Sequence, residues 1–142
     1  MEYFKFKKNI PNGFTLLELL VVIVIIGLLV AYVGPKYFSQ IGKSEATVAK
    51  AQIDAFEKAI EAFRLDVGRY PNQTEGLNAL VSASGQDQKW RGPYLKKGIP
   101  LDPWGKNYIY KFPGTKAEFE VISYGKDGVP GGSGDDADIS SN

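Results

Sequence analysis

The chain has 142 residues, a net charge of +1, and neither cysteine nor histidine. This composition excludes disulfide bonds, Ser-His-Asp and Cys-His catalysis, and metal sites built on histidine or cysteine. No basic stripe is interleaved with aromatic residues, so we expect no binding to nucleic acid.

An apolar segment near the N-terminus is long enough to cross a membrane. Residues 14–33 carry a single charge, Glu18, and a helix of this length spans about 30 Å, the thickness of the hydrocarbon core of a bilayer. The basic flank at residues 5–8 predicts that the N-terminus stays in the cytoplasm and that the C-terminal part lies on the other side. Glu18 either snorkels to the lipid headgroups, where the helix dipole favours it, or has a specific partner inside the membrane.

The start of this segment also carries a processing signal. The apolar run is too long for an ordinary secretory signal, and no small-residue cleavage site follows it. The basic leader, Gly13 and the run Phe14-Thr15-Leu16-Leu17-Glu18 resemble the class III signal of type IV pilins and pseudopilins. The resemblance implies that a prepilin peptidase removes residues 1–13 by cutting after Gly13 and then methylates the new amine of Phe14. It also implies that Glu18 pairs with this amine of a neighbouring subunit, so that Phe14 and Glu18 serve assembly.

We expect the helix to continue from the membrane segment, residues 14–35, into a domain formed by residues 36–142. Gly27 and the pair Gly34-Pro35 predict a kink or local melting, because glycine and proline are poor helix formers. Gly68 is expected to end the helix. Between these points mostly apolar side chains recur every three or four residues, which indicates an amphipathic helix packed on a domain. The stripe consists of Val48, Gln52, Phe56, Ile60 and Phe63, with Ala51, Ala55, Ala59 and Ala62 beside it.

The second half of the chain predicts a small sheet. Thr74 is expected to N-cap a short turn that runs to Leu80 or Val81. The β-favouring runs at residues 108–112 and 119–123, joined by residues 113–116, predict a hairpin. A small antiparallel sheet packed on the long helix gives an α+β fold, and the resemblance implies a pilin-like one. The intervening loop should anchor in the core through Trp90, Tyr94, Leu95, Ile99, Leu101 and Trp104.

Four further motifs carry a more specific resemblance, to the major pseudopilin of type II secretion. With the leader, they extend the similarity to Ile139, which is nearly the whole chain. Major type IV pilins, the alternative, share the N-terminal third but usually have a disulfide-closed head, which a chain without cysteine cannot form. The motifs are Leu65-Asp66-x-Gly68-Arg69-Tyr70-Pro71, Glu75-Gly76-Leu77-x-Ala79-Leu80, Trp90-x-Gly92-Pro93-Tyr94-Leu95-Lys96-Lys97 and Pro100-x-Asp102-Pro103-Trp104-Gly105-x-x-Tyr108.

The resemblance implies a structural function without catalysis. The processed chain would be a single-pass inner-membrane protein with its C-terminal domain in the periplasm. It would polymerise through its N-terminal helix into a short filament, together with minor pseudopilins and an inner-membrane assembly platform, and help drive folded proteins through an outer-membrane secretin. A third hypothesis is a membrane-anchored periplasmic enzyme or calcium-dependent binding module, which would need a pair of carboxylates in a pocket.

The C-terminal stretch at residues 124–139 combines glycine with aspartate and has almost no apolar side chain. Composition alone favours a solvated, disordered acidic tail over a site for a hard cation, for which oxygen ligands would select Ca²⁺ over Mg²⁺. The resemblance implies that this loop binds calcium. Because the loop is slightly longer than the form compared, it stays open whether Asp136 or Asp138 coordinates the ion. The implied ligands are Tyr124, Asp127, Val129, Ser133, Asp135, and Asp136 or Asp138.

Overall fold

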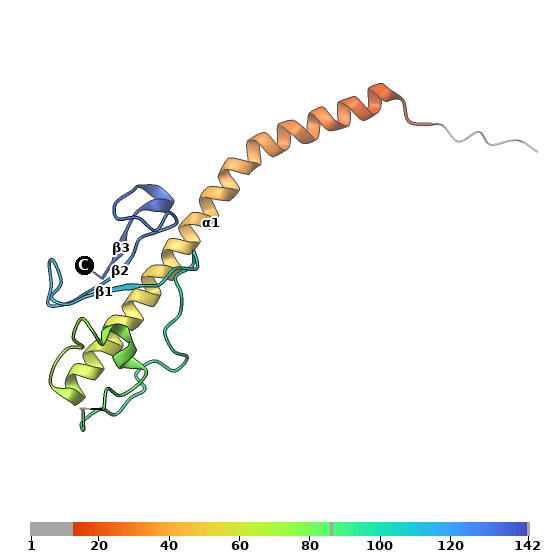
Figure 1. The fold of residues 1–142 in the computed structure, drawn as a ribbon. Helices are drawn as coiled ribbons and strands as arrows, with labels where there is room; N and C mark the ends of the chain where they lie inside the picture. Colours follow the sequence, from red (N-terminus) through yellow and green to blue (C-terminus); the bar gives the residue numbers. More distant parts are fainter. Residues whose placement is uncertain (1–12, 86, 142) are drawn as a thin grey trace, which may run out of the picture. The chain divides into compact units, whose positions relative to one another are not determined.

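The computed structural model describes residues 13–85 and 87–141 (Figure 1). The chain divides into two compact units, Met1–Phe38 and Ser39–Asn142. Most of the predicted leader lies outside the described residues, so its cleavage stays a prediction. The elements are α1 (Leu16–Val67), the 3₁₀ helix η1 (Gly76–Leu80), β1 (Ile109–Lys111), β2 (Glu120–Ser123), the 3₁₀ helix η2 (Gly134–Asp136) and β3 (Ile139–Ser140).

The first unit holds the apolar part of α1. Among the described residues this helix alone is long and apolar enough to cross a membrane, with a mean hydropathy of 3.0 in its most apolar window. The helix continues through Gly27, Gly34 and Pro35, so the predicted local melting is wrong. A proline removes one hydrogen bond from a helix, while the bonds before and after it hold the chain helical. A bend at Pro35 stays a prediction.

In the second unit α1 forms one wall of the core. The predicted amphipathic stripe is confirmed at Phe56, Ile60 and Phe63, each at most 1% exposed. In the first half of the stripe the buried positions lie one residue later than predicted, because Val48 is 46% exposed while Ala49 and Ile53 are buried. Burial at positions 49, 53, 56, 60 and 63 alternates steps of four and three residues, which keeps one face of the helix toward the core.

The end of α1 follows the prediction. Gly68 has φ of +87° and its N–H donates to the carbonyl of Arg64 at 2.8 Å. This left-handed residue satisfies a carbonyl of the last turn and releases the chain from the helix, as glycine does most readily.

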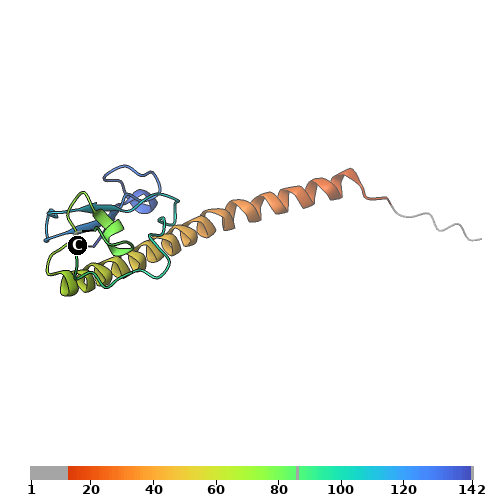
Figure 2. The same cartoon turned by 60° about the horizontal axis from the view of Figure 1, so that its bottom comes forward.

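A three-stranded antiparallel sheet of order β1-β2-β3 lies against the C-terminal half of α1 (Figures 1 and 2). The predicted hairpin is confirmed, with Ile109 opposite Ile122 and Lys111 opposite Glu120. Its connection is longer than expected and runs from residue 112 to residue 119. The third strand was not predicted, and it pairs Ile139 with Ser123. Tyr108 joins sheet and helix, since its ring meets that of Phe56 edge-on at 5.0 Å.

The outer edge of β1 is covered by a side chain. The backbone N–H and C=O of Val121 are hydrogen-bonded to Ser141, on the side of β2 away from β1. Tyr110 lies opposite Val121, so its own backbone N–H and C=O face away from β2. There Gln73 Nε2 donates to the Tyr110 carbonyl at 2.8 Å, and the Phe112 N–H donates to Gln73 Oε1 at 2.7 Å. Gln73 thus occupies hydrogen-bonding groups that would otherwise form an open sheet edge.

The turn before η1 is capped by a residue other than the predicted one. Thr74 makes no capping bond, and Glu75 holds the N-cap position. Instead the Glu75 N–H donates to Asn72 Oδ1 at 2.8 Å, and the Asn72 N–H donates to Glu75 Oε2 at 3.0 Å. Asn72 competes successfully because its short amide reaches a backbone N–H three residues ahead, as in a capping box.

Candidate functional site

The predicted assembly residues stand at the first turn of α1. Thr15 and Glu18 cap it reciprocally: the Glu18 N–H donates to Thr15 Oγ1 at 3.2 Å, and the Thr15 N–H donates to Glu18 Oε2 at 3.1 Å. This is a capping box, and its Thr-x-x-Glu pattern is the signal in the sequence that indicates it. Glu18 therefore has an intrachain function beside its predicted intersubunit one.

The same residues are accessible to another chain. Phe14 is 82% exposed, and Gly13 and Glu18 are exposed. The Thr15 N–H that Glu18 accepts belongs to the residue directly after Phe14. The capping box thus holds the carboxylate close to the position where cleavage after Gly13 would create a free amine.

The two arms of the acidic loop lie side by side. The Lys126 N–H donates to the Asp135 carbonyl at 3.0 Å, and a Cβ on Gly132 would lie 2.4 Å from the Asp136 carbonyl oxygen. The Gly128 N–H donates to the carbonyl of Tyr124 at 3.1 Å, which closes the first turn. Residues 124–129 and 133–138, which hold all the predicted ligands, are therefore neighbours.

Three of the four aspartates of the loop, Asp127, Asp135 and Asp138, point in different directions. Asp127 Oδ1 accepts the Val129 N–H at 3.1 Å, and Asp138 Oδ2 accepts the Gly131 N–H at 2.9 Å. Asp135 turns outward toward α1. In the described part of the chain no three acidic side chains gather as metal ligands. The remaining predicted ligands offer oxygens on both arms: Ser133 and Val129 are exposed, Tyr124 and Asp136 half-buried. The oxygen donors suit a hard cation in kind and neighbourhood, although the carboxylates are not directed at one centre.

A buried carboxylate anchors the turn beneath this loop. Asp102, 4% exposed, accepts the N–H groups of Trp104 at 3.1 Å and Lys106 at 2.7 Å through Oδ1, and the hydroxyl of Ser123 at 2.7 Å through Oδ2. Lys106 then reaches the acidic loop, where its Nζ donates to the Lys126 carbonyl at 2.6 Å. In the sequence Asp102 is distinguished only as part of a motif, and its spacing does not indicate this anchoring function.

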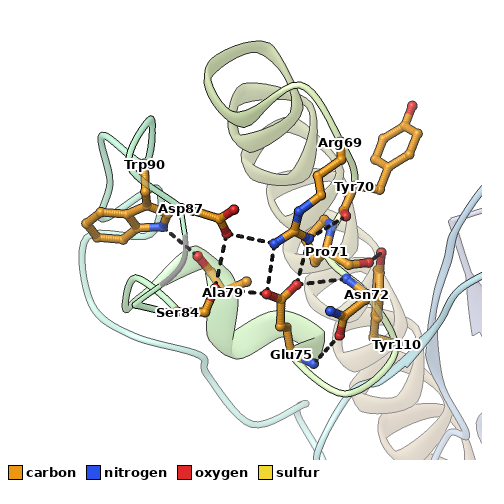
Figure 3. Close-up of polar contacts among 10 residues, drawn as sticks. All are labelled: Arg69, Tyr70, Pro71, Asn72, Glu75, Ala79, Ser84, Asp87, Trp90 and Tyr110. Atoms are coloured by element: carbon orange, nitrogen blue, oxygen red, sulfur yellow. Dashed lines mark hydrogen bonds and ion pairs between the residues drawn. The ribbon is translucent and has the colours of Figure 1, made fainter.

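The loop after η1 is held by an ionic network (Figure 3). Arg69 contacts Glu75 at 2.8 Å and Asp87 at 2.7 Å, and the Ser84 hydroxyl lies within hydrogen-bond distance of both carboxylates, at 2.9 Å and 3.1 Å. The hydrogen bond from Arg69 lowers the pKa of Glu75 to about 2, against the opposing effect of burial. Trp90 adds a bond from Nε1 to the Ala79 carbonyl at 2.8 Å.

The predicted anchors of residues 82–107 are mostly confirmed. Trp90, Tyr94, Leu95 and Ile99 pack against the core. The prediction that Leu101 is a core anchor is wrong, since this side chain is 52% exposed. Trp104 is half-buried and bonds α1 instead, donating from Nε1 to Glu45 Oε2 at 2.9 Å.

A hollow of about 480 Å³ lies between residues 73–78 and 107–110. Its lining includes one acidic side chain, Glu75, which is engaged by Arg69. A pair of carboxylates, which the third hypothesis needs, is therefore not found in this hollow.

Comparison with known proteins places these features in one family. Residues 36–142 match the family model described as "Type II secretion system (T2SS), protein G", and residues 9–34 match the "Prokaryotic N-terminal methylation motif". The Type II secretion system core protein G of Pseudomonas aeruginosa is 46% identical over 90% of this chain and 92% of its own length. That of Vibrio cholerae is 40% identical over 94% of this chain and 92% of its own length.

A solved structure agrees with the α+β, pilin-like fold. The crystal structure of the major pseudopilin from the type 2 secretion system of enterohaemorrhagic Escherichia coli matches with a TM-score of 0.62 and 30% identity. The match covers 73% of this chain and 91% of that one. These comparisons favour the pseudopilin reading over the type IV pilin alternative. The chain belongs to the type II secretion system protein G family, the major pseudopilins, which are structural subunits and not enzymes.

Proposed function

We propose that the chain, once cleaved after Gly13 and methylated at Phe14 by a prepilin peptidase, polymerises through α1 into a short periplasmic filament. The proposal is supported by the matched methylation motif and by the exposed apolar side chains at the start of α1. Before assembly the subunit crosses the inner membrane once, with its N-terminus in the cytoplasm and residues 36–142 in the periplasm. Minor pseudopilins, an assembly platform and an outer-membrane secretin are the partners that this function requires.

Glu18 is proposed to set the register of the filament. In lipid an unpaired carboxylate is costly, so capping of its own helix stabilises the single subunit, and the Phe14 amine of a neighbour offers a charged partner on assembly. Glu18→Gln keeps an oxygen acceptor for the Thr15 N–H but loses the charge. We expect Glu18→Gln to insert in membranes and to form few filaments, measured by crosslinking ladders in sheared cell fractions.

Leu16→Ala removes exposed apolar surface from the same turn without changing a charge, and it measures how much filament formation falls when apolar contact alone is lost. Normal ladders from Glu18→Gln would contradict the pairing with the amine.

The acidic loop at residues 124–139 is proposed to bind Ca²⁺. Support comes from the neighbouring arms and from the oxygen donors of Asp127, Asp135, and Asp136 or Asp138, with the Tyr124 and Val129 carbonyls and an oxygen of Ser133. The ion would supply positive charge where carboxylates otherwise repel one another. A ligand that binds only the folded state adds about 2.7 kcal/mol at a hundred times its dissociation constant.

The test is a thermal melt of residues 39–142, the compact unit that contains the whole core, in calcium, in magnesium and in chelator. We expect a rise of about 10 °C or more with calcium alone. An equal melting temperature in all three conditions would reject the calcium site and leave the filament function unaffected.

A further inference from the structure

The acidic loop reaches α1 at a single glycine. Gly42 is buried, and a Cβ placed on it would lie 1.9 Å from Asp135 Oδ1, 2.5 Å from Cγ and 2.7 Å from Oδ2. The other two glycines of α1, Gly27 and Gly34, have no atom within 4 Å of such a Cβ. The Asp135 carboxylate therefore occupies space that any side chain at position 42 would need.

Two further contacts surround this point. One turn along the helix, Trp104 Nε1 donates to Glu45 Oε2 at 2.9 Å. Lys106, from the same turn as Trp104, donates to the Lys126 carbonyl of the loop at 2.6 Å. Figures 1 and 2 both show the loop beside this part of α1. The loop is thus held between the helix and the turn at residues 102–106.

We propose that Gly42 is the positioning residue of the acidic loop, because its missing side chain lets the Asp135 carboxylate dock on α1. A helix interior favours alanine over glycine, so a glycine at a buried helical position calls for a reason, and here the carboxylate of Asp135, an exposed residue of the loop, lies where a side chain would stand. Docking fixes the arm at residues 133–138 while the Lys126 N–H bonds the Asp135 carbonyl. The part of the inference that concerns an ion rests on the calcium site proposed above.

This proposal predicts that positions 42 and 135 are energetically coupled. A methyl group at position 42 would push the carboxylate off the helix, so the helix-forming advantage of alanine would be opposed by the lost docking. In an Asp135→Ala background there is no carboxylate to displace, so Gly42→Ala should stabilise the protein through the helix-forming advantage of alanine. Contacting residues depart from additivity in this way, whereas independent sites add.

The experiment is a double-mutant cycle on the full chain in detergent, followed by the melting of its periplasmic unit in chelator. The four proteins are the parent, Gly42→Ala, Asp135→Ala and the double variant, so each substitution is its own control in the other background. We expect Gly42→Ala to lower the melting temperature of the parent, where the carboxylate has to move, and to raise that of Asp135→Ala, where it is absent. The same change in melting temperature from Gly42→Ala in both backgrounds would overturn the docking.

A calcium arm separates positioning from general packing. If docking sets the place of Asp135 among the proposed ligands, Gly42→Ala should lose at least half of the rise in melting temperature that calcium gives the parent. A full calcium response in Gly42→Ala would overturn the positioning function. A parent without any calcium response would reject the proposed ion site, while coupling in chelator would still support the docking of Asp135 on Gly42.

Discussion

Glu75 offers a quantitative test of the ionic network in Figure 3. Its side chain is 15% exposed, and the bond from Arg69 lowers its pKa from 4.5 to about 2. At about 1.4 kcal/mol for each pH unit, this difference corresponds to about 3 kcal/mol of folding stability at neutral pH. Because Arg69 is 39% exposed, solvent screening reduces the contribution, and we expect about 1.5–3 kcal/mol.

Glu75→Gln in residues 39–142 should therefore lower the melting temperature at pH 7 by about 10 °C. The pKa of the folded state lies below the unfolded value, so this stability is fully present above pH 4.5 and is lost as the pH falls to about 2. The difference in melting temperature between Glu75→Gln and the parent should accordingly become smaller as the pH falls from 4.5 to about 2. Circular dichroism can follow the melting.

Glu61→Gln is the control, because the Arg64–Glu61 pair is 3.5 Å apart with side chains 49% and 48% exposed. It should cost less than about 0.5 kcal/mol. A difference in melting temperature between Glu75→Gln and the parent that stays constant down to about pH 2 would refute the electrostatic reasoning and assign the loss to packing.

Two further predictions concern hydrogen bonds between side chains and the backbone. Asp102→Ala strands two N–H groups and the Ser123 hydroxyl, and should lower the free energy of unfolding by about 3 kcal/mol, whereas Asp102→Asn keeps an acceptor and should cost less than half of that. Urea midpoints measure both, and equal losses would contradict the hydrogen-bond account. Gln73→Ala should speed hydrogen exchange of the Phe112 amide about five- to tenfold, with the amide of Ile60, inside α1, as reference. An unchanged Phe112 rate would show that Gln73 does not protect the edge.

The periodic parts of the chain could be predicted from the sequence. The stripe through Phe56, Ile60 and Phe63 and the hairpin around β1 and β2 were found because burial repeats with the period of the element. The exit at Gly68 follows from one residue type whose conformational freedom is unusual.

The polar contacts could not be predicted in the same way. Arg69, Glu75 and Asp87 are separated by loops, and nothing in their spacing says that they meet. β3 has two residues, too few for a repeating pattern, and its pairing depends on where the acidic loop returns. The choice of Asn72 over Thr74 as a cap depends on the backbone path, which composition does not determine. In the acidic loop the residue types indicated a chemistry, whereas the directions of Asp127, Asp135 and Asp138 depend on individual bonds.

The pairing of Ser123 with Ile139 has a consequence for how freely the C-terminal loop can change in length. Both ends of residues 124–138 are fixed at adjacent positions on neighbouring strands, so the entropy of closing the loop is lost once, when β3 pairs with β2. Lengthening a closed loop adds little, since even a doubling costs only about 0.6 kcal/mol. An extra residue between Val129 and Gly131 should therefore be absorbed outside the sheet and leave the core intact, so that any cost falls on the bonds that Asp127 and Asp138 make within the loop.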